Sequence, residues 1–165
     1  MAMGELISHL VQGADTETGA WMLIDEAAAT GEQAAPWEQS WPGQGPDWLT
    51  IGPNALLCDT PRDFTPYIRL ELWSDQPAAP EPAWEHSWTD EIFFRSGKIH
   101  LLDYFDPCID SRLPFLDLGH QNATWLVRAQ HKTLENNQET DFPSYIYRAE
   151  IYKFQFWRPI PQDSP

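Results

Sequence analysis

The stretch Thr65-Pro66-Tyr67-Ile68-Arg69-Leu70-Glu71-Leu72-Trp73 decides the fold class of this chain. Its aliphatic residues at positions 68, 70 and 72 alternate with Arg69, Glu71 and Trp73. A period of two places successive side chains on opposite faces of a strand, and a helix does not produce it. The sequence therefore predicts a β-strand over residues 65–73.

Related patterns predict further strands on both sides of this stretch, and turn residues separate them. Ser96-Gly97 supplies a turn, so the strands on either side of it are expected to form a hairpin. Within the last strand the apolar phase changes at Ile151-Tyr152, which predicts a β-bulge or a crossing between sheets. The predicted strands are Gly19–Asp25, Leu49–Asp59, Trp84–Arg95, Lys98–Tyr104, Ala123–Lys132 and Ser144–Trp157, with a short one at Phe115–Leu118.

Seven or eight short strands without a long amphipathic helix predict an all-β chain, built as an antiparallel β-sandwich. A length of 165 residues fits one domain, so we expect residues 1–165 to form a single β-sandwich domain. Residues 26–47 are rich in proline and glycine and are predicted to form an irregular, exposed insert, with one or two helical turns in Ala27–Ala35.

Charge is the most informative feature of the composition. The chain has 25 acidic and 10 basic residues, a net charge of −15, and its first basic residue is Arg62. Like charges repel, so direct binding to nucleic acid is disfavoured. Two interpretations remain open: a solubilising surface, or an acidic face that binds a basic protein partner.

Composition also bears on compartment. No apolar stretch approaches the length of a membrane span, and the first ten residues carry no basic residue. Cys58 and Cys108 are too few for a secreted disulfide scaffold. We therefore expect a cytoplasmic protein that does not bind membranes.

No catalytic or cofactor motif is present. The chain has no glycine-rich phosphate loop and no G-x-S-x-G nucleophile elbow, and its histidines lack zinc-ligand spacing. His100, Asp103 and Asp106 are the residues that come nearest to a carboxylate and histidine site. We expect no cofactor, no metal and no catalytic residue.

Two short segments share a pattern of paired tryptophans: Trp37-Glu38-Gln39-Ser40-Trp41 and Trp84-Glu85-His86-Ser87-Trp88. Residues four apart share a face on a strand and on a helix, so each pair could form an aromatic platform. The alternative is that the tryptophans pack in the core. The candidate partner-binding residues are Trp37, Trp41, Trp84, Trp88, Glu38, Glu85 and Asp47.

The stretch from Tyr67 to Pro159 resembles a group of small bacterial proteins related to competence protein J, the inhibitor of a DNA-entry nuclease. The resemblance is carried by residues 68–73, by the Gly119 loop leading to residues 125–128, and by residues 154–157 before Pro159. The chain departs from the pattern at two places: an insertion lies between Gly119 and Trp125, and Arg158 separates Trp157 from Pro159. The resemblance implies a β-sandwich and a binding role, and it carries over no functional residues.

The sequence thus favours a non-enzymatic acidic binding protein, an immunity or inhibitor protein that engages a basic effector such as a nuclease. The alternative is a β-sandwich that binds a carbohydrate or another small ligand on its paired tryptophans. A third possibility is an enzyme that uses carboxylates and histidines around His100, Asp103, Asp106 and His120.

Overall fold

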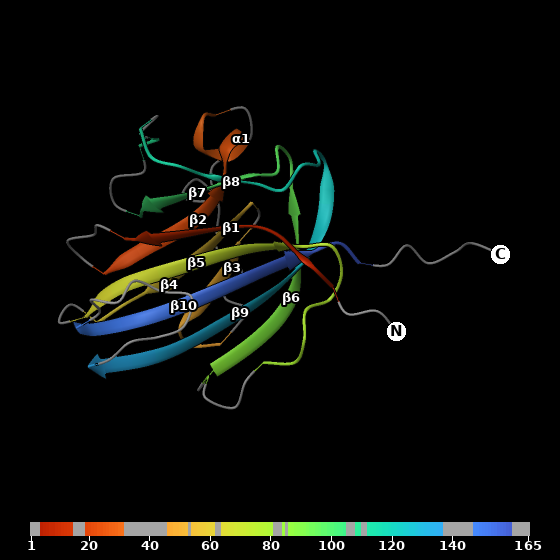
Figure 1. Cartoon of the computed structure of the whole chain (residues 1–165). Coiled ribbons are helices and arrows are strands. Elements are labelled where there is room, and N and C mark those ends of the chain that lie inside the picture. Colours follow the sequence, from red (N-terminus) through yellow and green to blue (C-terminus); the bar gives the residue numbers. More distant parts are fainter. Residues whose placement is uncertain are drawn as a thin grey trace.

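The structure is a computed structural model that describes residues 4–14, 19–31, 46–52, 54–61, 64–80, 84, 86–104, 108–109, 112–136 and 147–159. These residues form ten strands and one helix of four residues (Figure 1). The elements are β1 (Leu6–Gly13), β2 (Ala20–Asp25), α1 (Glu26–Ala29), β3 (Leu49–Gly52), β4 (Ala55–Asp59), β5 (Thr65–Trp73), β6 (His86–Phe94), β7 (Lys98–Asp103), β8 (Leu116–Asp117), β9 (Ala123–Asn136) and β10 (Tyr147–Trp157).

The strands form two five-stranded sheets. Sheet A has the order β1-β5-β10-β9-β6, and sheet B has the order β3-β4-β2-β7-β8. The predicted all-β class is confirmed. Every pair is antiparallel except β5 with β10, which run parallel at the centre of sheet A, so the prediction of purely antiparallel sheets is wrong there. A parallel pair needs a long connection, and the residue pattern of neither strand indicates its direction.

One hydrophobic core joins the inner faces of the two sheets. Trp21 of sheet B packs edge-on against Tyr152 of sheet A, with ring centroids 4.8 Å apart. The polar tips of this pair are satisfied inside the core. Thr60 Oγ1 accepts a hydrogen bond from Trp21 Nε1 at 3.0 Å and lies 2.9 Å from the Tyr152 hydroxyl. Buried aromatic residues of this kind need such partners.

The predicted hairpin across Ser96-Gly97 is wrong. β6 pairs with β9 in sheet A, whereas β7 pairs with β2 and β8 in sheet B, so the chain crosses between sheets at this turn. The fully buried Asp25 carboxylate holds the corner, because it accepts hydrogen bonds from Ser96 N, Ser96 Oγ and Gly97 N at 2.8–3.2 Å. Gly97 has φ +74°, and a Cβ there would lie 2.3 Å from the His120 carbonyl oxygen.

The predicted irregularity in the last strand is also absent. β10 keeps a constant register with β9 and with β5 along its described length. Its apolar phase changes because β10 is a central strand: Ile151 is buried on one face and Tyr152 on the other. Burial on both faces removes the need for alternation.

Two predicted segments differ in detail. Leu49–Asp59 is two strands, β3 and β4, because Asn54 has φ +68° and turns the chain between them. The predicted insert begins with α1, in which Ala27 and Ala28 are buried, and residues 32–45 lie outside the described part of the chain. Among the described residues, no helix has the length and apolar character required to span a membrane.

The hydrogen bonds of Asp25 to the Ser96-Gly97 turn predict that a single substitution has a large effect on stability. Asp25→Ala leaves three donors without an acceptor, of which Gly97 N is buried and both Ser96 donors are partly buried. We therefore expect the free energy of unfolding to fall by about 2–4 kcal/mol. Urea unfolding at pH 7 measures the change. Asp59→Ala removes an exposed carboxylate as the control and should stay within about 0.5 kcal/mol of the wild type. Equal effects of the two substitutions would contradict the proposed role of Asp25.

Candidate functional site

The face of sheet A that points away from the core is polar yet buried. We call it the outer face; alternation along β5, β10 and β9 brings its side chains together. A sheet face open to water would leave such residues exposed, whereas all of these except Lys153 are at most 6% exposed. Another part of the chain must therefore cover them. The outer-face residues are Arg69, Glu71, Arg128, Gln130, Lys132, Lys153 and Gln155.

Glu71 is the centre of a hydrogen-bond network on the outer face. Its carboxylate accepts from Arg69 Nε at 2.6 Å, from Trp73 Nε1 at 3.0 Å and from Gln155 Nε2 at 2.8 Å. Gln155 Oε1 in turn accepts from Arg128 Nε at 2.7 Å. The network therefore links β5, β10 and β9, and it satisfies a buried charge that would otherwise be costly.

The ionisation of the network follows from these contacts. Burial alone would raise the pKa of Glu71, but hydrogen bonds from Arg69, Gln155 and Trp73, with the charge of Lys153, outweigh burial and lower that pKa. Burial lowers the pKa of the Arg128 guanidinium, and the charge of Glu71 counteracts this effect. Both groups are therefore held in a charged, buried arrangement.

Residues 77–80 and Trp84, which follow β5 and are called the covering segment below, cover the outer face. The Ala78 carbonyl oxygen accepts a hydrogen bond from Arg128 at 2.5 Å, and Pro77 is buried. Trp84 is 8% exposed and lies beneath two ammonium groups, with Lys132 Nζ 4.5 Å and Lys153 Nζ 5.0 Å from its ring centroid. Cation–π contacts of this type favour a fixed aromatic ring.

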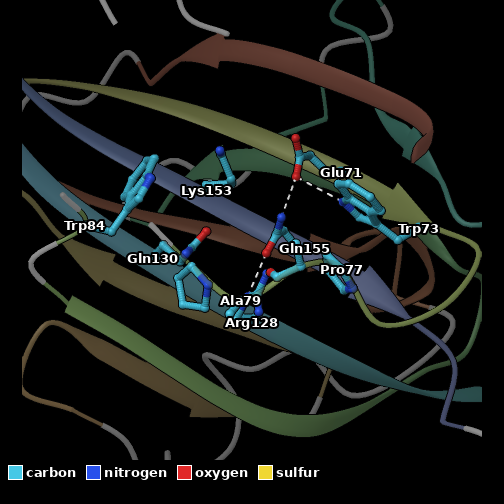
Figure 2. Close-up of a pocket in the computed structure, with 11 residues that line it drawn as sticks. Glu71, Trp73, Pro77, Ala79, Trp84, Arg128, Gln130, Lys153 and Gln155 are labelled. Carbon is cyan, nitrogen blue, oxygen red and sulfur yellow. Dashed lines mark hydrogen bonds between the residues drawn. The ribbon is translucent and has the colours of Figure 1, made fainter. Parts of the chain in front are cut away.

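A pocket of about 230 Å³ remains between the covering segment and the outer face. Figure 2 shows Trp84 and Trp73 at its two ends, with Lys153, Gln155 and Gln130 between them. The pocket thus combines indole rings and prolines with amide and cationic groups, a lining that suits a small polar ligand.

The exposed charged residues are mainly acidic. Burial removes bases and acids in equal number among the described residues: Arg69, Arg128 and Lys132 are buried, and so are Asp25, Glu71 and Glu150. Among the described residues the exposed bases are Arg95, Arg112 and Arg158, whereas the exposed acids are Glu5, Asp47, Asp59, Asp90, Glu91 and Asp117. Two of these acids are adjacent on β6, an edge strand of sheet A.

The structure places three of the candidate partner-binding residues. Asp47 is exposed, and the neighbouring Trp48 lies 6.4 Å from His86 between ring centroids, at the start of β6. Trp88 is half-buried and packs on the core, and Trp84 is buried on the outer face. Trp37, Glu38, Trp41 and Glu85 lie outside the described residues.

Trp84 and Trp88 lie on opposite faces of sheet A and share no platform. Trp88 follows the alternation of β6 and pairs with Ala129, a core residue. Trp84 precedes the first residue of the strand, His86, and contacts the outer-face lysines. Residues four apart share a face only within one regular element, and Trp84 lies outside β6 whereas Trp88 lies within it.

The residues considered for metal or acid–base chemistry do not gather into a site within the described part of the chain. His100 Nε2 lies 3.1 Å from a Glu26 carboxylate oxygen, and its ring stacks on Phe115. Among the described residues, no group of three potential metal ligands occurs. Asp106 lies outside these residues. Cys58 is buried, Cys108 is exposed, and both are free thiols.

The sequence reasoning missed a second polar cluster on the inner face of sheet A. His131 Nε2 forms a hydrogen bond with Glu150 Oε2, and Glu150 Oε1 accepts a hydrogen bond from Thr133 Oγ1 at 2.7 Å. The His86 ring stacks on His131, with centroids 5.4 Å apart. His131 Nδ1 is buried and has no hydrogen-bond partner among the described residues.

Two solved structures are similar to this chain. ComJ from Bacillus subtilis, an inhibitor of the DNA degrading activity of NucA, aligns over 96% of this chain and 100% of its own, with a TM-score of 0.55 and 10% identity. The chain has a ComJ-like fold. A protein described as crocagin biosynthetic gene J aligns over 96% of this chain and 99% of its own, with a TM-score of 0.56 and 16% identity.

These similarities confirm the resemblance to competence protein J in fold. No protein-family model and no curated protein sequence matches the chain. At identities of 10% and 16% the comparison with ComJ and the second protein concerns the fold alone. The role of this ComJ-like chain therefore has to be argued from its own residues.

The network predicts a specific acid sensitivity. Because the pKa of Glu71 is lowered from its ordinary value of 4.5 in the folded state, its stabilising contribution is complete above that value and is lost as the pH falls towards the folded-state pKa. Glu71→Gln should reduce stability by about 1–3 kcal/mol at pH 7. The difference from the wild type should shrink towards pH 3.

Urea unfolding between pH 7 and pH 3 checks this expectation. Glu91→Gln, which neutralises an exposed carboxylate on β6, is the matched control and should keep the wild-type pH dependence. A Glu71→Gln protein whose stability follows the wild type in parallel at every pH would contradict the network.

Proposed function

We propose that this chain is a non-enzymatic, cytoplasmic β-sandwich protein that binds and neutralises a basic effector protein, as an inhibitor or immunity protein does. The excess of exposed carboxylates carries the proposal. The chain has a net charge of −15, and the exposed charged residues that the structure describes are six acids and three bases. Such a surface attracts a basic partner and speeds its association.

The ComJ-like fold supports this proposal. ComJ is an inhibitor of a DNA-degrading activity, and its full length aligns with 96% of this chain. An enzyme that degrades DNA benefits from a basic surface, because the phosphate backbone is negatively charged. An acidic inhibitor is complementary to such a surface.

We infer that the partner docks on the β6 edge. Asp90 and Glu91 are exposed there, and Phe93 is 46% exposed. Trp88 is half-buried on the same strand, and Trp48, which follows the exposed Asp47, contacts its first residue. Aromatic anchors with charged surroundings are the usual composition of a protein interface.

The geometry favours this reading over sugar stacking on a Trp84–Trp88 platform. Stacking requires exposed rings that share one face. Trp84 is 8% exposed and lies across the sheet from Trp88. An enzymatic role has no comparable support, because His131 Nδ1 is buried and the His100 ring packs against Phe115.

Charge reversal on β6 tests the proposed function. The wild type and the double variant Asp90→Lys/Glu91→Lys are immobilised and exposed to lysate of the native host, then washed with rising salt. We expect the wild type to retain a basic protein at low salt and release it at high salt, and the variant to retain about tenfold less.

The matched control is Asp59→Lys/Asp117→Lys, which makes the same change of charge at exposed positions of sheet B. It should retain the partner at low salt. Equal loss from both variants would contradict the β6 interface, and a partner that high salt does not release would contradict the electrostatic basis of the proposal.

A further inference from the structure

The pocket on the outer face of sheet A has no part in the proposed inhibitor function. It is lined by side chains from β5, β9 and β10 and by the covering segment, and its volume is about 230 Å³. The residues that matter for its chemistry are Trp73, Trp84, Arg128, Gln130, Lys153 and Gln155 (Figure 2). Two features of this lining are unexplained by folding alone.

The first feature is an excess of positive charge. The pocket lining holds the cations Arg128 and Lys153 against one carboxylate, Glu71. That carboxylate is already engaged by Arg69, Trp73 and Gln155. Within the described part of the chain Lys153 Nζ forms no hydrogen bond or ion pair; it lies 5.0 Å from the Trp84 ring centroid, and its charge acts on Glu71 from a distance. The lining therefore carries one net positive charge.

The second feature is a side-chain amide that opens onto the pocket and has no hydrogen-bond partner among the described residues. Gln130 is 2% exposed and lines the pocket, yet its side-chain amide makes no hydrogen bond to any residue that the structure describes. Buried polar side chains are normally hydrogen-bonded, and an amide can donate two hydrogen bonds and accept others. In the register of β9 and β10, Gln130 is directly paired with Lys153, so both groups border the same space.

We propose that this pocket binds a small organic carboxylate. The Lys153 ammonium and the Gln130 amide receive the carboxylate group, and the apolar part of the ligand packs against Trp84, Pro77 and Pro80. Charge-assisted hydrogen bonds to a carboxylate are stronger than those between neutral groups. The ligand thereby satisfies both unexplained features at once.

The charge and the size of the pocket restrict the ligand. One net positive charge matches a monoanion, whereas a phosphate dianion would add repulsion from Glu71. A pocket of about 230 Å³ lies below the range of about 300–1,000 Å³ that is usual for drug-sized ligands. The expected ligand is therefore a carboxylate with a single ring or a short apolar chain.

Isothermal titration calorimetry with benzoate tests the proposal on the full chain. Benzamide has the same shape without the charge, and phenyl phosphate carries the same ring on a dianion. We expect benzoate to bind the wild type at least about tenfold more tightly than either of them. Comparable affinity for benzamide would overturn the role of charge, and tighter binding of phenyl phosphate would overturn the assignment to a carboxylate.

Substitution of the lysine locates the binding site. Lys153→Met keeps the length and apolar contacts of the side chain but removes its charge, and it should weaken benzoate binding about tenfold or more. Lys98→Met, at a half-buried lysine of sheet B, is the matched control and should leave the affinity unchanged. Equal loss in both variants would place binding elsewhere and overturn the proposal.

A second variant protects the test against misfolding. Gln130→Met removes the amide without adding charge, and near-ultraviolet circular dichroism reports whether each variant keeps the wild-type core. A folded Gln130→Met protein that binds benzoate as tightly as the wild type would overturn the role of Gln130. Absence of benzoate binding to the wild type at about 10 mM would overturn the proposal entirely. Capture of the basic partner by β6 is measured in a separate experiment. Failure of benzoate binding therefore does not count against the inhibitor proposal, and failure of partner capture does not count against the pocket.

Discussion

The buried ion pair between Arg69 and Glu71, 2.6 Å between Nε and Oε2, is the constraint on which the rest of sheet A depends. A buried charge is tolerated only when its partners are all in place, and the partners of Glu71 come from two parallel strands, β5 and β10. The same network orders Arg128, which holds the covering segment through the Ala78 carbonyl oxygen. Burial of Arg69, Glu71 and Arg128 is therefore one arrangement that joins β5, β10 and β9 to the covering segment.

The local sequence pattern was sufficient to predict the positions of most strands, but it did not predict which strands pair with one another. The alternation in residues 65–73 correctly identified β5 and its core face, because a period of two depends only on neighbouring residues. It could not reveal that the face with Arg69 and Glu71 is also buried, since that follows from the covering segment and from β9 and β10. The turn at Ser96-Gly97 was recognised, but its direction is set by Asp25, 71 residues earlier in the chain.

The candidate site was less predictable than the fold. The spacing of Trp84 and Trp88 indicated a shared face. Because β6 begins between them, at His86, Trp84 lies on the outer face and Trp88 packs on the core. The pocket and the His131–Glu150 pair both join residues from different strands whose adjacency is fixed by register. A single sequence carries no signal of register across a 10-residue connection, whereas net charge, which needs no geometry, pointed directly to the proposed class of partner.

An inhibitor role for this ComJ-like fold accounts for the exposed carboxylates of β6. The central claim is that binding is driven by charge. The most direct measurement is the association rate constant with the captured basic partner over a range of ionic strength. We predict a steep fall of that rate constant with added salt, by about tenfold or more, while the dissociation rate constant changes little. An association rate constant that is independent of salt would contradict the account.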